Sequence, residues 1–224
     1  MPGRGPVILV HGVGLSHRYL VPLAALLADQ LPVYLPDLPG FGRSYKPLQV
    51  LTLDELADWL TDWMRTLGLR DACVMGQSLG CQVVVHLAAR HPELVGRLVL
   101  QGVTVDPAAR TRWQQFIRWR KNQQTEDKSA MPSAFPDYLA CGVRRIICTY
   151  KHAVDDRPEQ LVPRIQCPAL VVRGENDVIG SAAWHKQVTD LLPKGRLETV
   201  AGAGHTINVS APEHLAQLLR TVCP

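Results

Sequence analysis

Short runs of β-branched and aliphatic residues alternate with longer amphipathic segments along most of this chain. The short runs predict strands at residues 7–10, 33–35, 72–75, 97–101, 169–173 and 196–200. Apolar residues recur at helical spacing between them and predict helices at residues 20–31, 52–67, 79–90, 181–192 and 210–222. Strands that alternate with helices are typical of βαβ units, which build a parallel sheet. We therefore expect an α/β fold, with a mostly parallel sheet of about six strands and helices on both faces.

The alternation stops at residues 103–163, where the sequence contains no strand pattern. This stretch is helix-like, contains tryptophan and carries ten Lys or Arg against seven Asp or Glu. Parallel α/β sheets bind their ligands beyond the carboxyl ends of the strands. We therefore interpret residues 103–163 as a lid inserted over that edge, within a single domain of residues 1–224.

Composition and charge exclude several classes of protein. A chain with 46% hydrophobic and 20% charged residues is neither disordered nor collagen-like. No apolar run reaches the roughly 18–20 residues of a membrane span, and the first apolar run is too short for a signal peptide. The net charge is only +4, and the basic residues 110–121 match no nucleic-acid-binding motif. These observations predict a cytoplasmic protein with no nucleic-acid partner and no membrane span.

Cysteine and histidine spacing does not indicate a metal site. The six cysteines form neither a C-x-x-C pair nor a zinc-finger pattern, and the eight histidines lack tight ligand spacing. Cys73, Cys81 and Cys167 lie among apolar residues, where a free thiol packs as a small hydrophobe. The prediction is therefore reduced, mostly buried cysteines and no bound metal.

The sequence Gly76-Gln77-Ser78-Leu79-Gly80 follows a predicted strand and begins a predicted helix. A G-x-S-x-G string alone is only moderately specific, but this context is the one that a nucleophile elbow requires. There the serine occupies a strained turn, and the flanking glycines relieve crowding. Ser78 is thus the candidate nucleophile.

A serine hydroxyl needs a base, and that base needs an acid to orient it. His205 lies in a glycine-rich loop after the last predicted strand, and Asp177 follows the strand at residues 169–173. Glu175 competes with Asp177 as the acid, but Asp177 lies further into the loop and is preferred. The order Ser78, Asp177, His205 is that of one particular fold with a catalytic triad.

Acyl transfer also needs hydrogen-bond donors for the developing oxyanion. The sequence His11-Gly12-Val13-Gly14 follows the first strand and can turn its backbone toward Ser78. We expect the backbone N–H groups of Val13 and Leu79 to form an oxyanion hole. His11 is interpreted as a structural residue of this loop.

These motifs resemble the α/β-hydrolase superfamily over nearly the whole chain. The segments that carry the resemblance are VILVHGVG, PDLPGFGRS, GQSLG, RHPELVGRLVLQG, CPALVVRGENDVI and GAGHTINVSAPEHL. The resemblance implies a serine esterase without a cofactor. Serine at position 78, where the epoxide-hydrolase and haloalkane-dehalogenase branches use aspartate, argues against those branches.

The leading hypothesis is a carboxylesterase that cleaves small esters through an acyl-enzyme on Ser78. A meta-cleavage-product hydrolase, which splits a carbon–carbon bond, is the first alternative, with Arg112, Arg118 or Trp113 holding an anionic substrate. Lactonase, thioesterase and perhydrolase activities use the same triad and stay open. A non-catalytic ligand receptor is the alternative from a different class.

Trp113, Phe116 and Ile117 recur at helical spacing and are candidate substrate-pocket residues. They are interpreted as the inner face of a compact lid helix, and contact with a lipid interface is the alternative. A compact lid favours short acyl chains.

Members of the superfamily commonly carry a β-hairpin before the strand that leads to the His-Gly loop. Here that strand begins at residue 7, so the hairpin is expected to be absent and the strand at residues 33–35 becomes a sheet edge. Bare edges invite pairing. Either a second subunit in a homodimer shields this edge, or the chain starts at an internal position.

Overall fold

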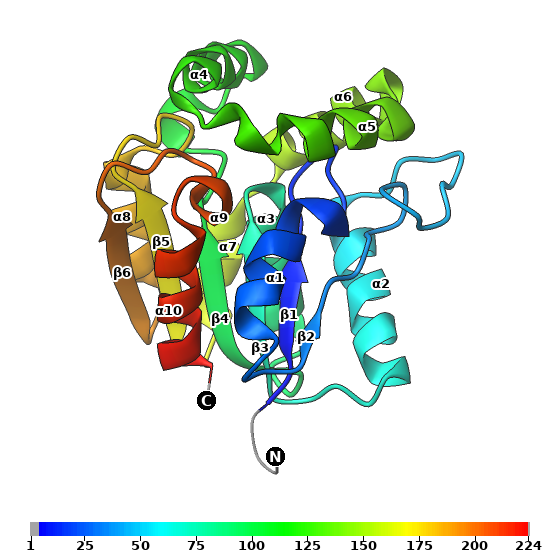
Figure 1. The fold of residues 1–224 in the computed structure, drawn as a ribbon, viewed down its shortest axis with the longest axis vertical. Coiled ribbons are helices and arrows are strands. Elements are labelled where there is room, and N and C mark those ends of the chain that lie inside the picture. The colour runs from blue at the N-terminus through cyan, green and yellow to red at the C-terminus, as the bar shows by residue number, and fades with distance from the viewer. Residues whose placement is uncertain (1–4, 224) are drawn as a thin grey trace.

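The computed structural model describes residues 5–223, without the side chains of residues 125, 130 and 133. Six parallel strands form one sheet in the order β2-β1-β3-β4-β5-β6. Their bounds are β1 Val7–Val10, β2 Val33–Tyr34, β3 Ala72–Gln77, β4 Val95–Gln101, β5 Ala169–Gly174 and β6 Gly195–Val200. The predicted parallel sheet of about six strands is therefore confirmed (Figure 1).

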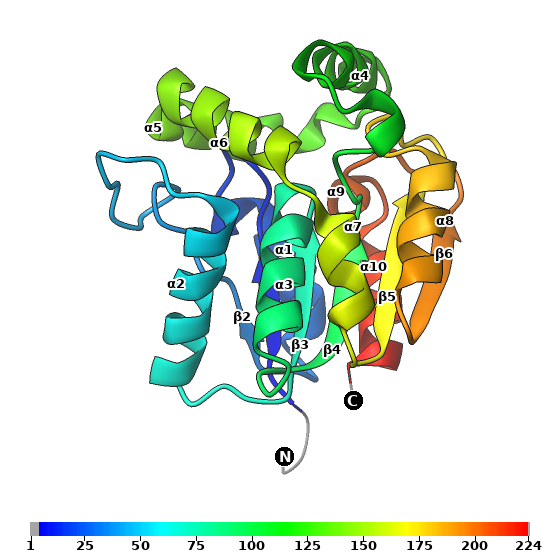
Figure 2. The same ribbon diagram turned by 180° about the vertical axis from the view of Figure 1, so that it is seen from behind.

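Helices cover both faces of this sheet (Figures 1 and 2). One face carries α1 Val21–Leu27 and α10 Pro212–Val222, with the short α9 Ile207–Ser210 beside them. The opposite face carries α2 Leu53–Thr66, α3 Leu79–Arg90 and α8 Ala182–Leu191. Short 3₁₀ turns are η1 His17–Leu20, η2 Pro107–Ala109, η3 Lys128–Ala130 and η4 Val162–Arg164.

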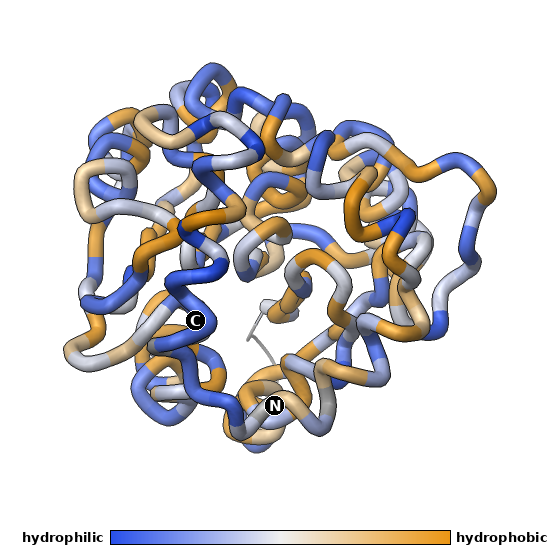
Figure 3. Tube along the Cα trace, turned by 90° about the horizontal axis from the view of Figure 1, so that it is seen from above, coloured by the Kyte–Doolittle hydropathy of each residue, from blue (hydrophilic) through white to orange (hydrophobic). Residues whose placement is uncertain are grey.

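The sheet forms the centre of two hydrophobic cores, one on each face. All four residues of β1 are fully buried, as are Val74 and Met75 of β3. Strands buried on both faces read as continuous aliphatic runs, which is why VILV predicts a central strand. Helices α2 and α10 instead combine buried apolar residues with exposed polar ones, because only one side of each meets a core, and the trace likewise mixes apolar and polar residues around its periphery (Figure 3).

Local sequence signals set the helix boundaries closely. Thr52 caps α2: its hydroxyl accepts the Glu55 backbone N–H at 3.3 Å, and the Glu55 carboxylate accepts the Thr52 N–H at 2.7 Å. This reciprocal capping box satisfies amides that have no partner inside the helix. Helix α3 spans Leu79–Arg90, the range that the sequence predicts.

The edge strand β2 is only two residues long. Within the described range no strand precedes β1, and β2 stands at the end of the sheet, where it pairs with β1 alone. Tyr34 of β2 contacts Trp63 of α2 edge to face, with ring centroids 6.2 Å apart. A short edge strand covered by a neighbouring helix presents few unpaired backbone groups.

The chain between β4 and β5 leaves the sheet and forms four helices: α4 Arg112–Thr125, α5 Met131–Cys141, α6 Val143–Asp155 and α7 Pro158–Leu161. Helices α4, α5 and α6, hereafter the cap helices, lie beyond the carboxyl ends of the strands (Figure 1). Asp137 of α5 fastens them to the body below. It accepts the Ser16 hydroxyl at 2.5 Å and the Arg18 guanidinium at 3.2 Å.

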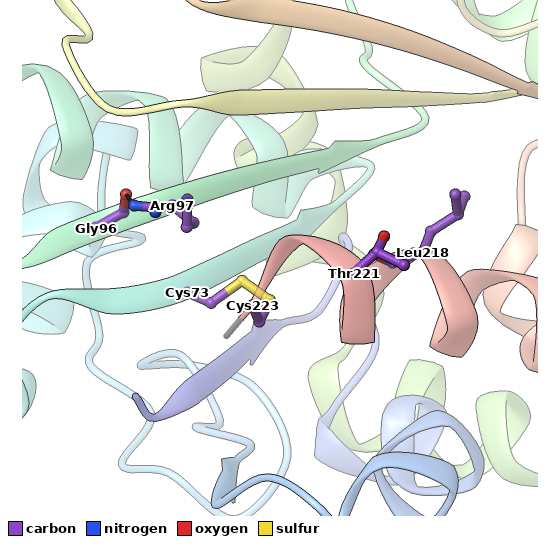
Figure 4. The surroundings of a disulfide bond; sticks show 6 residues. All are labelled: Cys73, Gly96, Arg97, Leu218, Thr221 and Cys223. Carbon is purple, nitrogen blue, oxygen red and sulfur yellow. Dashed lines mark hydrogen bonds between the residues drawn. A yellow bond between two sulfur atoms is a disulfide. The ribbon is translucent and has the colours of Figure 1, made fainter. Parts of the chain in front are cut away.

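The expectation that all six cysteines are reduced is wrong for two of them. Cys73 of β3 and Cys223, just after α10, form a disulfide although 150 residues separate them (Figure 4). Both are buried among apolar residues, so each resembles a free core cysteine in the sequence. Their pairing depends on α10 packing against the sheet, which local spacing does not report. The other four cysteines are free.

Among the described residues, no helix is long and apolar enough to cross a bilayer.

Candidate active site

Ser78 occupies the sharp turn between β3 and α3, at the carboxyl end of the sheet. Its backbone has φ 55° and ψ −119°, which places a non-glycine residue in the left-handed half of conformational space. Such strain persists only where the surroundings hold it, and it is typical of functional turns. Here the Ser78 N–H donates to the Gln101 carbonyl at 2.9 Å, and the Ser78 carbonyl accepts the Cys81 N–H at 2.9 Å.

Two glycines allow this turn to pack against its neighbours. A Cβ atom at Gly76 would lie 2.4 Å from the Gly80 carbonyl oxygen, and one at Gly80 would lie 2.4 Å from the Val10 carbonyl oxygen. Real Cβ atoms do not approach backbone this closely. The two glycines of the G-x-S-x-G string therefore let β3, α3 and β1 meet at the position of Ser78.

The structure brings Asp177 and His205 together from loops that follow β5 and β6. His205 Nδ1 donates to Asp177 Oδ2 at 2.9 Å. The other carboxylate oxygen, Oδ1, accepts the backbone N–H groups of Ile179 at 2.8 Å and Gly180 at 3.2 Å. Asp177 and His205 are 4% and 3% exposed, so the pair lies inside the protein.

The electrostatics of this pair follow from its burial and its partners. Burial alone would raise the pKa of Asp177, but the charge and hydrogen bonds of its partners, His205 first, outweigh it and lower that pKa. Burial would lower the pKa of His205, but the Asp177 carboxylate, with a smaller contribution from Glu126, raises it. The imidazolium form of His205 is therefore stabilised where it stands.

The second ring nitrogen of His205 is available for chemistry. Nε2 is buried and has no hydrogen-bond partner among the described residues. His205 and Ser78 line the same cavity, together with Gly12, Val13 and Leu79. Within residues 5–223 Nε2 is not hydrogen-bonded to the Ser78 hydroxyl, so the structure brings the two residues to one cavity without a direct hydrogen bond between them.

Glu175, the competing acid, has a different role. Its carboxylate accepts the Gly202 backbone N–H at 2.8 Å and is exposed to solvent. The hydrogen-bond partner of His205 is Asp177, the residue preferred from the sequence.

His11 holds the loop that precedes Val13. Its Nδ1 donates to the Gly12 carbonyl at 2.9 Å and its Nε2 accepts the Leu38 N–H at 3.1 Å. Burial lowers the pKa of His11, so the ring stays neutral. With both nitrogens engaged, His11 fits the structural role expected of it. Leu79 is the first residue of α3, and its N–H therefore has no acceptor within the helix.

The cavity over Ser78 has a volume of about 790 Å³ and lies between the sheet and the cap helices. Its walls are mostly apolar, with Leu15 and Leu79 below and Phe116, Trp119, Ile146 and Ile147 above. Three charged side chains other than histidine line it: Glu126, Asp127 and Lys128. A cavity of this size can hold a drug-sized ligand.

Only one of the three residues predicted to line the substrate pocket does so in the structure. Phe116 lines the cavity, whereas Trp113 and Ile117 are not among its lining residues. The expected inner face is instead half open: Trp113 is 68% exposed, Phe116 43% and Ile117 37%. Phe116 stacks between Trp113 and Trp119, with centroids 5.7 and 5.9 Å away. The aromatic row thus runs from the cavity out to the surface of α4.

The arginines considered for an anionic substrate do not line the cavity. Arg118 is engaged by the Asp106 carboxylate at 2.7 Å and by the Ile179 carbonyl at 3.0 Å. Arg112 is exposed and lies 3.5 Å from Asp155.

Three residues near the site were not predicted from the sequence. Gln101, at the end of β4, donates from Nε2 to the His205 carbonyl at 3.0 Å. Glu126, at the end of α4, binds the backbone of the His205 loop. The Tyr150 hydroxyl is buried without a partner among the described residues, and burial raises the pKa of Tyr150 to about 12. Gln101 lies in a segment that carries the family resemblance, but the sequence does not indicate the contacts of any of the three, so only tertiary placement identifies them.

No group of three or more His, Cys, Asp or Glu side chains in residues 5–223 is arranged to hold a metal ion.

Comparison with known proteins places this chain in a family. Residues 7–218 match the model of the alpha/beta hydrolase family. The chain belongs to this family. It is a hydrolase by membership, and its serine elbow, buried carboxylate and loop histidine follow strands β3, β5 and β6 of that fold.

The relatives span several hydrolase chemistries. The chain is 29% identical to a 2-(acetamidomethylene)succinate hydrolase of Mesorhizobium japonicum, over 94% of this chain and 85% of that protein. It is 33% identical to a haloalkane dehalogenase of Mycolicibacterium paratuberculosis, over 51% of this chain and 39% of the relative. A thermophilic esterase from Thermogutta terrifontis has the same fold, with a TM-score of 0.82, 23% identity and coverage of 98% and 91%.

Proposed function

We propose that this protein is a serine carboxylesterase that hydrolyses neutral esters through an acyl-enzyme on Ser78. The observation that carries the proposal is the 2.9 Å hydrogen bond between Asp177 and His205, whose free Nε2 shares a cavity with the strained Ser78. A nucleophile, a base and an orienting acid are the parts that acyl transfer requires.

In the proposed reaction, His205 Nε2 takes the Ser78 hydroxyl proton as the serine oxygen attacks the ester carbonyl. The developing oxyanion accepts hydrogen bonds from the backbone N–H groups of Val13 and Leu79. His205 then gives its proton to the leaving alcohol, which departs and leaves the acyl group on Ser78. A water molecule, deprotonated by His205, attacks the acyl carbonyl, and the proton returns to Ser78 as the acid is released. Asp177 stabilises the imidazolium in both halves of the cycle.

The cap helices are proposed to act as the lid of this site, and their lining favours a neutral substrate. Two carboxylates and one ammonium line the cavity, so an anionic substrate would meet a net negative wall. This argues against the carbon–carbon bond alternative, whose substrates are anionic. The same negative lining is unsuited to the substrate for which the Mesorhizobium relative is named, because a succinate carries two carboxylates. Lactone and thioester substrates are compatible with the same lining.

The cavity volume bears on the expectation of short acyl chains. About 790 Å³ exceeds what an acetyl group fills, and the aromatic wall rewards apolar contact. We therefore propose that acyl groups longer than acetate are preferred.

Ester turnover by wild type and Ser78→Ala tests the proposal. We expect wild type to hydrolyse p-nitrophenyl esters from acetate to dodecanoate, with a maximum beyond acetate, and Ser78→Ala to lose activity by roughly 10⁴-fold or more. A fluorophosphonate should label wild type at Ser78 and leave the variant unlabelled. A vinylogous 1,5-diketo acid turned over faster than every ester would favour the carbon–carbon alternative. Tight ligand binding without any turnover or labelling would favour the receptor.

Two further expectations stay predictions. A homodimer that shields the β2 edge is one of them. The other is a cytoplasmic location, against which the Cys73–Cys223 bond argues, because disulfides are rare in reducing compartments.

A further inference from the structure

Glu126 crosses from the cap helices to the loop that carries His205. It directly follows the last residue of α4, and its carboxylate accepts hydrogen bonds from two successive backbone amides 79 and 80 residues further along the chain. Oε1 accepts the His205 N–H at 2.5 Å and the Thr206 N–H at 3.2 Å, and Oε2 accepts the Thr206 hydroxyl. One side chain therefore satisfies three donors of the loop.

These bonds complete a set of anchors around His205. Asp177 holds the ring at Nδ1, and Gln101 holds the backbone carbonyl at 3.0 Å. Glu126 holds the backbone N–H. The first two anchors belong to the sheet and its loops, whereas Glu126 belongs to the cap. Hydrogen bonds to an ionised acceptor are about twice as strong as neutral ones, so this contact is well suited to fix the loop.

We propose that Glu126 is a positioning residue that holds His205 in its working place and thereby couples the position of helix α4 to the histidine. The proposal rests on the proposed function, because it concerns the same His205. A displacement of α4 would remove the acceptor from two loop amides at once. His205 is then correctly placed only while helix α4 stays in contact with the loop that carries it.

The charge of Glu126 has a second consequence for His205. The carboxylate stands near the ring and, after Asp177, favours its protonated form, which raises the pKa of His205. Asp177 and His185 interact electrostatically with His205 from the loop after β5 and from α8. The other titratable groups that line the cavity with His205 and Glu126 are Tyr19, Asp127, Lys128, Tyr138 and Tyr150. His185 is neutral, because its Nε2 accepts the Val103 N–H and burial lowers its pKa.

The test compares Glu126→Gln and Glu126→Asp with a matched control, Glu159→Gln. Glu159 also belongs to the segment between β4 and β5 and accepts two bonds from Arg110, at 2.7 and 2.9 Å, but it does not line the cavity. We expect Glu126→Gln to lower kcat by roughly ten- to a hundred-fold with little change in KM, as misplacement of a catalytic group does. The acid limb of its kcat/KM profile should move to lower pH. Glu126→Asp should keep the limb near that of wild type, and Glu159→Gln should match wild type throughout.

A direct titration separates this inference from the proposed function. The His205 Cε1 proton, followed by NMR in the resting protein, should titrate at lower pH in Glu126→Gln than in wild type. An unchanged His205 titration together with an unchanged kcat would overturn the inference, as would an equal loss of kcat in Glu159→Gln.

If Glu126→Gln does not fold, Thr206→Val serves instead. This variant keeps the charge of Glu126, and we expect a lower kcat with an acid limb at the same pH as in wild type. An unchanged kcat in Thr206→Val would then overturn it. A wild type that hydrolyses no ester contradicts the proposed function, yet the NMR titration still decides the role of Glu126.

Discussion

The carboxylate of Asp177 acts on His205 through both geometry and charge. It accepts Nδ1–H and so presents the free Nε2 to the cavity, and it stabilises the imidazolium. Replacing it in Asp177→Asn removes the charge and permits the wrong ring tautomer. We expect kcat for ester hydrolysis to fall by roughly 10³–10⁴-fold. Stopped-flow or steady-state assays on a p-nitrophenyl ester measure this loss.

The sign of the pH effect follows from the raised pKa of His205. The base works only when neutral, so the wild-type rate falls as pH drops through a value above the ordinary 6.5. In Asp177→Asn that fall should occur at lower pH. Glu175→Gln is the matched control, because the exposed Glu175 carboxylate accepts the Gly202 N–H rather than a bond from His205, so the profile should stay unchanged. If the pH–rate profile shifted in Glu175→Gln and not in Asp177→Asn, Glu175 would be the acid that orients His205.

Single residues also show how far the sequence can be interpreted. Ser78, Asp177 and His205 each follow a strand, so their motifs predict that they meet at one edge of the sheet. Glu126 and Gln101 contact the same loop, but Glu126 directly follows α4 and Gln101 is the last residue of β4, on the other side of the site. Their roles arise from contacts across 79 and 104 residues, which no local pattern encodes.

At the scale of elements, His86 joins α3 to two neighbours. Its Nδ1 lies 2.8 Å from Asp54 of α2, and its Nε2 lies 3.0 Å from Asp156, just after α6. Burial would lower the pKa of His86, but Asp156 and then Asp54 raise it above 6.5. The stability from this raised pKa is fully present below the unfolded pKa near 6.5 and is lost as pH rises through the folded pKa.

We therefore expect His86→Gln to lower the free energy of unfolding by roughly 1–2 kcal/mol at acidic pH, with Asp54 contributing little because it is exposed. The difference from wild type should shrink as pH rises. Urea denaturation at several pH values measures it, and His214→Gln, an exposed histidine of α10, is the control. A difference that grows with pH would mean that His86 is neutral in the folded protein.

Elements differ in how well the sequence predicts them. Helix α3 begins at the elbow and ends before Pro92, so both of its boundaries are marked. Helix α4 does begin at a capping box of Thr111 and Gln114. The aromatic row of α4 is exposed rather than packed on a core, so a helical pattern there does not indicate which side faces inward.

At the scale of the whole molecule, alternation predicts a parallel sheet but not its strand order. The order β2-β1-β3-β4-β5-β6 depends on which crossovers pass over which face. It places β3 between β1 and β4, which brings Gly12, Ser78 and Gln101 to one edge. The same topology brings the end of α10 against β3, and the disulfide follows from that long-range packing.

The Cys73–Cys223 bond closes a loop of 150 residues and links the last helix to a central strand (Figure 4). A cross-link of that span restricts the unfolded chain, so reduction should lower the free energy of unfolding by about 2–5 kcal/mol. Cys73 lies near the start of β3, whereas Ser78 follows its end, so ester turnover at low temperature should not change. Urea denaturation with and without a phosphine reductant measures the first effect, and an ester assay the second.

A thiol count tests whether the bond exists before its energetics are measured. Denatured, unreduced protein should react with an alkylating reagent at four cysteines, Cys81, Cys141, Cys148 and Cys167, and reduced protein at all six. The double variant Cys73→Ala/Cys223→Ala should be less stable than wild type and insensitive to reductant. Cys167→Ser, which removes a free thiol, should respond to reductant as wild type does. Six reactive thiols without reductant would show that the two sulfurs are unbonded, and would remove the objection to a reducing compartment.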